Sequence, residues 1–283
     1  MSLMKILSIR QRSGFLRTLQ VDLHRALLSW RFLLTIGLIL AWLIMNGATY
    51  IFIYQFLYST GIPVIFDEAI TGRSGLGMIV LSLATIPYST SYLTDTSSGF
   101  VHHATHRAGF TAYAFARVIS VAISAFLAMV IAAGIFLAGL CLTGAPINAI
   151  PGNGTTFNGV YTDLVIQVGP WCYFLVRFTL SGLTAAMAAV FGLYSTTLIP
   201  NAYVALVTPL ILYYSWDAII TVLFTLTGGV LQYTSYFAMI NNIMLQPTRY
   251  NGFSFIWTSV FLLTLTALWG RGFILRLRKE QGL

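Results

Sequence analysis

The sequence predicts an all-α integral membrane protein with six transmembrane helices. Hydrophobic residues make up 58% of its 283 residues and charged residues only 8%, whereas ordinary globular domains carry about 25% charged residues. The mean hydropathy is +0.83. Apolar stretches near the ~20 residues needed to cross a bilayer recur along the chain. These observations exclude a soluble globular domain and an intrinsically disordered chain. They indicate one transmembrane domain over residues 1–283.

The first predicted element is an amphipathic helix in residues 1–31. Arg17, Asp22, Arg25 and Arg31 lie mostly away from the apolar face of this helix. The residues that recur on that face at helical spacing are Phe15, Leu16, Leu19, Leu23, Leu27 and Trp30. Such a pattern is typical of a helix on the membrane surface. The alternative is that these residues are a basic segment before the first span whose only role is to set the orientation of the chain in the membrane. The first thirty residues lack the pattern of a cleavable signal peptide.

Six membrane spans are predicted after this helix. They are Phe32–Phe56, Leu76–Leu93, Ala112–Leu142, Trp171–Leu198, Ala202–Leu226 and Phe253–Phe273. Pro87 interrupts the second span, and Pro200 marks a tight turn between the fourth and the fifth. Small residues repeat every four positions in the third and fourth spans, at Ser124, Ala128 and Ala132 and at Ser181, Ala185 and Ala189. Such rows let helices approach closely in lipid, which favours a packed bundle.

Two of the connecting segments are too long for tight turns. Residues 143–170 are rich in Gly, Asn and Thr, which predicts an exposed outer loop. Residues 227–252 are too polar to span the membrane and too apolar to form a fully water-exposed loop. This predicts a re-entrant outer hairpin that packs on protein. Residues 95–111 and 274–283 are predicted as a loop and a tail on the cytoplasmic side.

The distribution of basic residues sets the predicted orientation. The net charge is +8, from 15 Lys and Arg against 7 Asp and Glu. With both termini in the cytoplasm, only Arg73, Arg177 and Arg249 fall outside. The other twelve lie inside: Lys5, Arg10, Arg12, Arg17, Arg25, Arg31, Arg107, Arg117, Arg271, Arg276, Arg278 and Lys279. This bias is the positive-inside pattern of a multi-pass plasma-membrane protein. Anionic membrane lipids explain the charge more simply than nucleic acid does, so no nucleic-acid partner is expected.

Charges within a span are costly and commonly functional. Arg177 and Asp217 lie in two antiparallel spans, at depths that differ by six residues, or about 9 Å. They are candidates for an ion pair or for a polar substrate path that also includes Trp216, Asn241 and Asn242. A lipid-facing Arg177 with an unrelated Asp217 is the third alternative.

Cys141 and Cys172 flank the outer loop. They are either a disulfide or two unbonded thiols, and the sequence leaves both readings open.

The sequence offers little for metal or nucleotide chemistry. His102 and His106 lie on one helical face and can share a metal. His103, however, occupies the position where a metalloprotease has its glutamate base, so no metal site is predicted. The chain also has no P-loop motif, and its two lysines are Lys5 and Lys279. ATP hydrolysis by that route is therefore not expected of this chain.

Residues 94–117 read TDTSSGFVHHATHRAGFTAYAFAR. An acidic residue closes span two, a glycine follows four residues later, and a short basic helix leads to a Thr-x-Tyr-x-x-x-Arg start of span three. The residues in these places are Asp95, Gly99, Arg107, Thr111, Tyr113 and Arg117. This segment resembles the permease subunits of type-2 ATP-binding-cassette (ABC) exporters, which more often have glutamate at the first place. The interfacial helix, six spans, cytoplasmic termini and outer re-entrant hairpin also resemble that family.

The resemblance implies an export function. Two permease copies would pair as a homodimer or with a close paralogue, and separate ATPase subunits carrying ATP and Mg would dock underneath. The segment Gly99–Gly109 would be the coupling helix. The residues implied in ATPase coupling are Asp95, Gly99, His102, His103, His106 and Arg107. This chain itself would bind no cofactor and catalyse no reaction.

The aromatic content of 14% and the scarcity of charges favour an amphipathic or hydrophobic cargo. A peptide, an antibiotic or a lipid-like molecule exported from a bacterial cell is the expectation. Two other classes stay open. One is a non-transporting membrane scaffold or a sporulation or sensory component, which needs no gated cavity. The other is an intramembrane metal-dependent enzyme, which needs more metal ligands than the histidine segment supplies.

Overall fold

The structure is a computed structural model that describes residues 3–52, 61–71, 79–147, 169–226 and 252–280. Within these ranges all regular secondary structure is helical. The helices are α1 (Leu3–Leu27), α2 (Trp30–Phe52), α4 (Ile62–Thr71), α5 (Ile79–Leu83), α6 (Ser91–Ser97), α7 (Phe100–Ala108), α8 (Phe110–Leu142), α10 (Pro170–Leu198), α11 (Ala202–Leu226) and α13 (Gly252–Glu280). The prediction of an all-α chain is confirmed for this part of the molecule.

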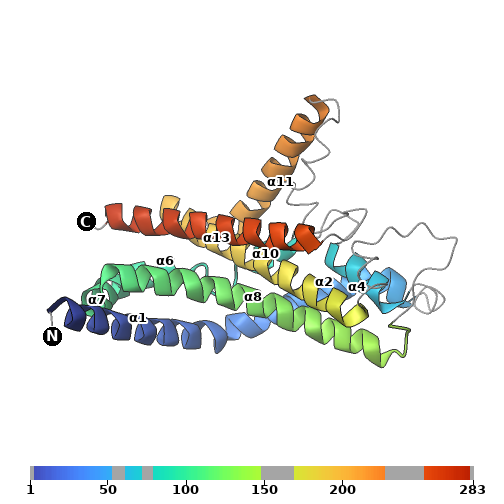
Figure 1. The fold of residues 1–283 in the computed structure, drawn as a ribbon, viewed down its shortest axis with the longest axis horizontal. Coiled ribbons are helices and arrows are strands. Elements are labelled where there is room, and N and C mark those ends of the chain that lie inside the picture. The colour runs from blue at the N-terminus through green and yellow to red at the C-terminus, as the bar shows by residue number, and fades with distance from the viewer. Residues whose placement is uncertain (1–2, 53–60, 72–78, 148–168, 227–251, 281–283) are drawn as a thin grey trace.

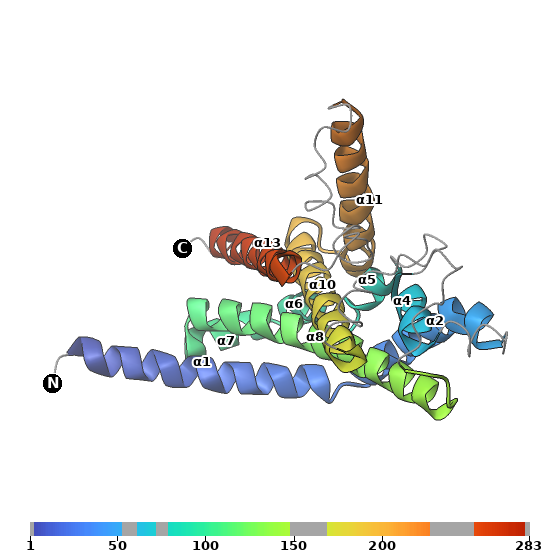
Figure 2. The same ribbon diagram turned by 45° about the vertical axis from the view of Figure 1, so that its right-hand side comes forward.

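Helices α8, α10 and α13 lie side by side, and α1 runs along the first part of α8 (Figure 1). Helix α2 packs on the second part of α8, whereas α11 projects away from the other helices (Figures 1 and 2). The beginning of α1, the short helix α7 and the end of α13 lie at the same end of the molecule in both views. The cations predicted to face the cytoplasm are concentrated in these three segments.

Four helical segments are long and apolar enough to cross a bilayer: Trp30–Ala48, Phe110–Leu142, Pro170–Leu198 and Phe255–Lys279. They correspond to the first, third, fourth and sixth predicted spans, and they are compatible with a multi-pass membrane protein. Helix α11 has the predicted bounds of the fifth span, but its described apolar stretch, Ala202–Ser215, is shorter than a span. The total of six crossings therefore stays a prediction.

The second predicted span, Leu76–Leu93, is not one continuous helix in the described residues. Residues 84–90 form turns between α5 and α6. Pro87 has no backbone N–H to donate and restricts the residue before it, so an α-helix does not continue through it. The serines on either side form tertiary hydrogen bonds instead. Ser82 Oγ donates to the Leu206 carbonyl at 2.6 Å, and Ser89 Oγ donates to the Ala189 carbonyl at 2.9 Å.

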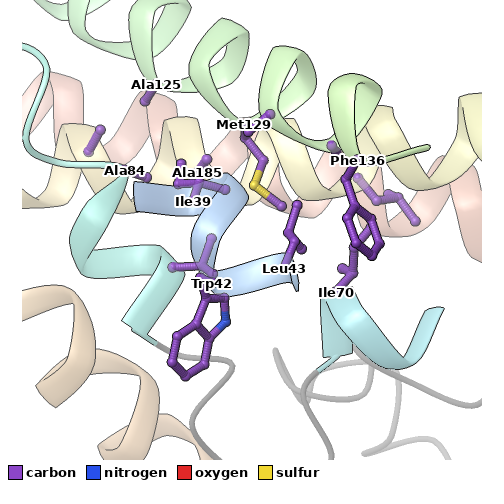
Figure 3. Packing of buried hydrophobic residues seen from close by; sticks show 14 of the residues in the cluster. Ile39, Trp42, Leu43, Ile70, Ala84, Ala125, Met129, Phe136 and Ala185 are labelled. Carbon is purple, nitrogen blue, oxygen red and sulfur yellow. The ribbon is translucent and has the colours of Figure 1, made fainter. Parts of the chain in front are cut away.

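The main hydrophobic core lies where α2, α4, α8 and α10 meet (Figure 3). Ile39 and Leu43 of α2 and Met129 of α8 are nearly or fully buried in it. Ser124, Ala128 and Ala132 of α8 and Ser181, Ala185 and Ala189 of α10 are all buried. The prediction that the rows of small residues pack between helices is thereby confirmed. Their small side chains allow the two helix backbones to approach closely.

Gly192 marks the closest approach between α10 and α11. A Cβ atom there would lie 2.8 Å from the Ala205 carbonyl oxygen. Pro209, four residues after Ala205, has no N–H to donate to that oxygen. The backbone of α11 therefore occupies the space that a side chain at Gly192 of α10 would need.

Replacing Gly192 with alanine is expected to destabilise the protein by about 1–3 kcal/mol, because the added methyl group meets backbone that cannot rotate away. Thermal unfolding in detergent micelles measures the effect. Gly139→Ala in α8 is the matched control, since a Cβ atom there meets nothing within 4 Å. It is expected to change stability by less than about 1 kcal/mol. Equal losses in the two variants would contradict the close approach.

Helix α1 forms as predicted, but a different face of it packs on the protein. Asp22 and Ala26 are buried, and Gly14 and Thr18 continue the same row at four-residue spacing. Leu16 and Trp30, assigned to the apolar face from sequence, are 63% and 68% exposed. The row of small residues on this face allows α1 to lie close to its neighbouring helices, and Asp22 has charged partners on the same face. The surface location of α1 on a membrane stays a prediction.

The ends of the other predicted segments are as follows. Residues 274–280 of the predicted cytoplasmic tail continue α13 as helix, and Leu277 is buried. Helix α8 ends at Leu142 and α10 begins at Pro170, which matches the predicted loop over 143–170. Most of that loop, and all but the last residue of the hairpin predicted over 227–252, lies outside the described residues.

Candidate functional site

A buried group of charged and aromatic residues joins α1, the turn before α6, α6 itself and α8. We call this group the charge cluster. Its members are Asp22, Arg25, Tyr88, Asp95, Tyr113 and Arg117. It lies next to α7, at the end of the molecule where the basic segments gather. The Arg25 guanidinium lies over the ring of Phe100 in α7, 5.2 Å from its centroid, so the cluster contacts the predicted coupling helix as well as a predicted membrane span.

Arg117 is the centre of the charge cluster. Its side chain is fully buried, and its guanidinium forms an ion pair with Asp95. Its Nε lies 3.6 Å from Asp22 Oδ2. The guanidinium also lies over the rings of Tyr88 and Tyr113, 4.9 and 5.2 Å from their centroids. Two carboxylates and two aromatic faces thus compensate for the loss of water around this cation.

Asp95 connects three helices through its two oxygens. Oδ1 accepts a hydrogen bond from the Arg25 guanidinium of α1 at 3.1 Å. Oδ2 accepts one from the Tyr113 hydroxyl of α8 at 3.4 Å and also faces Arg117. Asp95 itself lies in α6 and is buried. It is therefore the residue through which α1, α6 and α8 are linked.

Asp22 provides the second link between α1 and α8. Its Oδ1 accepts a hydrogen bond from the Tyr88 hydroxyl at 3.0 Å. Burial raises the pKa of the Asp22 carboxyl above its usual range, although Arg117 and the Tyr88 hydroxyl act in the opposite direction. Loss of water outweighs the nearby cation in this environment.

The short helix α7 is bounded by two glycines with positive φ, Gly99 at 71° and Gly109 at 86°. Glycine adopts such angles without steric cost, so the chain reverses before and after the helix. His103, His106 and Arg107 are exposed on it. The side chain of His102 lies outside the described residues. The segment Gly99–Gly109 predicted as the coupling helix is thus a distinct helix between two reversals.

A groove of about 930 Å³ lies between α1 and α7. Its lining comes mainly from one face of each helix. The lining residues are Gly14, Arg17, Thr18, Val21, Asp22, Phe100, His103, Ala104, His106, Arg107, Ala108 and Tyr113. The groove therefore brings together two basic segments that are about 90 residues apart in the sequence.

The residues predicted for a substrate path are not assembled by the described structure. Arg177 is buried and forms an ion pair with Asp67 of α4. The Tyr173 hydroxyl donates to Asp67 Oδ1 at 2.9 Å. The side chains of Trp216 and Asp217 lie outside the described residues. Asn241 and Asn242 also lie outside them. The substrate path stays a prediction.

Cys141 and Cys172 are free, half-buried thiols in the structure. Within the described residues, no group of three or more His, Cys, Asp or Glu side chains is placed to hold a metal ion.

Sequence reasoning placed Asp95, Tyr113 and Arg117 in one motif but missed their partners Asp22, Arg25 and Tyr88. Asp22 appeared only as a polar residue of an amphipathic helix, and Tyr88 was not singled out. The one available signal was that Asp22 continues the small row of Gly14 and Thr18 in an otherwise basic helix. Asp67 was missed because the segment between the first two spans carries no motif.

The described residues form a helical protein whose four long apolar helices are compatible with a multi-pass membrane protein. Comparison with protein families, with curated proteins and with solved structures finds no match to this chain.

Proposed function

We propose that this chain is the membrane-spanning permease subunit of an ATP-driven ABC exporter. The observation that carries the proposal is α7, a short basic helix between two glycine reversals that packs against α1, α6 and α8. It meets the charge cluster where the Arg25 guanidinium lies over the Phe100 ring, 5.2 Å from its centroid. A helix packed in this way transmits a conformational change of a docked ATPase to the predicted membrane spans. The resemblance of residues 94–117 to type-2 exporter permeases supports the same role.

In this proposal the energy comes from a separate ATPase subunit that carries ATP and Mg. The ATPase contacts α7 and the start of α1, and a second permease copy completes the transport path. Because α7 packs against α1, α6 and α8, and these three helices share Asp95, a movement of α7 is passed to them together rather than to one helix alone. The cargo is an amphipathic or hydrophobic molecule, and the chain resides in the plasma membrane with both termini inside.

Replacing Arg107 with glutamate is expected to reduce the amount of co-purifying ATPase at least tenfold, because it reverses one charge on the exposed face of α7. Tagged full-length protein is purified from its native membranes, and nucleotide-dependent ATP hydrolysis and the co-purifying subunits are measured. Arg278→Glu, on the exposed end of α13, is the matched control and is expected to retain the partner.

Membrane insertion is measured for both variants, because a misfolded permease would lose its partner for a trivial reason. Normal insertion with loss of the ATPase supports docking through α7. If the unaltered chain purifies without any ATP-binding-cassette subunit, or if Arg278→Glu loses as much of the partner as Arg107→Glu, the proposed function is wrong.

A further inference from the structure

The groove between α1 and α7 has the dimensions and the chemistry of a binding site for a small ligand. Its volume of about 930 Å³ is in the range of ligand pockets. It lies beside the charge cluster, on the side of α7 that faces α1. None of the ion pairs of the charge cluster involves the basic side chains that line it.

The groove favours an anion. Arg17 from α1 and His103, His106 and Arg107 from α7 line it, and all four residues are exposed. The one acidic residue in the lining is Asp22. Its Oδ1 accepts from Tyr88 and its Oδ2 faces Arg117, so its charge is directed into the charge cluster. Two guanidinium groups that line one groove from different helices suit the oxygens of a phosphate.

Apolar side chains in and beside the groove indicate that the anion is amphipathic. Val21 and Phe100 line it and are 53% and 39% exposed. A free inorganic anion would leave the exposed parts of these two side chains uncovered. The acyl chains and glycerol backbone of a lipid would cover them.

We propose that the groove between α1 and α7 binds the phosphate headgroup of an anionic glycerophospholipid, with Arg17 and Arg107 as its main ligands. Basic pockets between helices on the cytoplasmic side are suited to such headgroups. A bound lipid bridges α1 and α7, which holds the predicted coupling helix at a fixed distance from α1. This inference concerns the chain alone and requires no ATPase partner.

The test uses the purified full-length chain in neutral detergent micelles. Phosphatidylglycerol is added to one sample, phosphatidylcholine to a second and inorganic phosphate to a third, and native mass spectrometry and thermal unfolding are measured. Phosphatidylglycerol is expected to bind and to raise the unfolding temperature, whereas the other two have little effect. The double variant Arg17→Gln, Arg107→Gln is expected to bind phosphatidylglycerol at least tenfold more weakly.

The matched control is Arg271→Gln, Arg278→Gln, which removes two exposed cations from α13 at the same end of the molecule. This control is expected to retain full binding. Both double variants are compared without lipid first, so that a folding defect is recognised by a lowered unfolding temperature.

Three results would overturn the proposal. If both double variants bind phosphatidylglycerol equally weakly, the lipid is attracted by the overall positive charge rather than by a specific site. If inorganic phosphate raises the unfolding temperature as much as phosphatidylglycerol does, the groove binds free phosphate rather than a lipid headgroup. Undiminished lipid binding in the groove variant means that the lipid binds elsewhere on the chain.

Discussion

Replacing Asp95 with asparagine is expected to lower the free energy of unfolding by about 3 kcal/mol, because it removes a carboxylate that pairs with a fully buried cation. Arg117 then has Asp22 at 3.6 Å as its remaining charged partner in the cluster. The links from Asp95 to Arg25 and Tyr113 are weakened at the same time. Thermal or chemical unfolding in detergent micelles measures the loss.

Arg25→Gln is the control for this variant. It removes the other ion pair of Asp95, but the Arg25 side chain is 42% exposed. Exposed pairs contribute about 1 kcal/mol or less, so this variant is expected to lose much less stability. In the double variant Asp95→Asn, Arg117→Gln the loss is expected to be smaller than the sum of the two single losses, because the unpaired cation is gone. Equal losses from Asp95→Asn and Arg25→Gln would refute a central role for Asp95.

The second large effect is expected at the opposite end of the described helices. Asp67→Asn keeps the size of the side chain but removes a buried counterion of Arg177. We expect a loss of about 3 kcal/mol, because the guanidinium stays buried among apolar residues of α8 and α10. Tyr173→Phe leaves the ion pair in place and removes the hydrogen bonds of the hydroxyl to Asp67 and to the Pro63 carbonyl, and it is expected to lose about 1–2 kcal/mol. Unfolding of the purified protein gives both values.

An apolar replacement of the pair tests this explanation. Asp67→Leu combined with Arg177→Met removes both charges at similar volume, and such exchanges are often neutral or stabilising. We expect the double variant to recover most of the stability that Asp67→Asn loses. A double variant as unstable as Asp67→Asn would mean that shape, and not charge, sets the role of these residues.

The sequence was most informative where one helix carries its own signals. The bounds of α8, α10 and α11 agree with the predicted spans to within two residues. Gly99 and Gly109 bound α7 as the motif indicated, since the requirement for positive φ is local. The small rows in α8 and α10 are buried as their four-residue spacing predicts.

Sequence reasoning was least informative where the outcome depends on the relative position of two helices. The apolar residues of α1 predicted a membrane-facing side but not the side that packs on the protein, which is set by Asp22 and by the small residues in line with it. The second predicted span is apolar enough to cross, but Pro87 and two tertiary hydrogen bonds from serines divide it.

Composition and periodicity by themselves determined that this chain is helical, apolar and basic at specific segments, because these properties are summed over neighbouring residues. Only the tertiary structure decided which charges meet. Arg25 and Asp95 are 70 residues apart, Tyr88 and Asp22 are 66 apart, and Tyr173 and Asp67 are 106 apart. Pairing across such separations depends on how the helices pack and rotate against one another, and no local pattern encodes that. The same packing forms the groove between Arg17 and Arg107, in which we place the lipid headgroup.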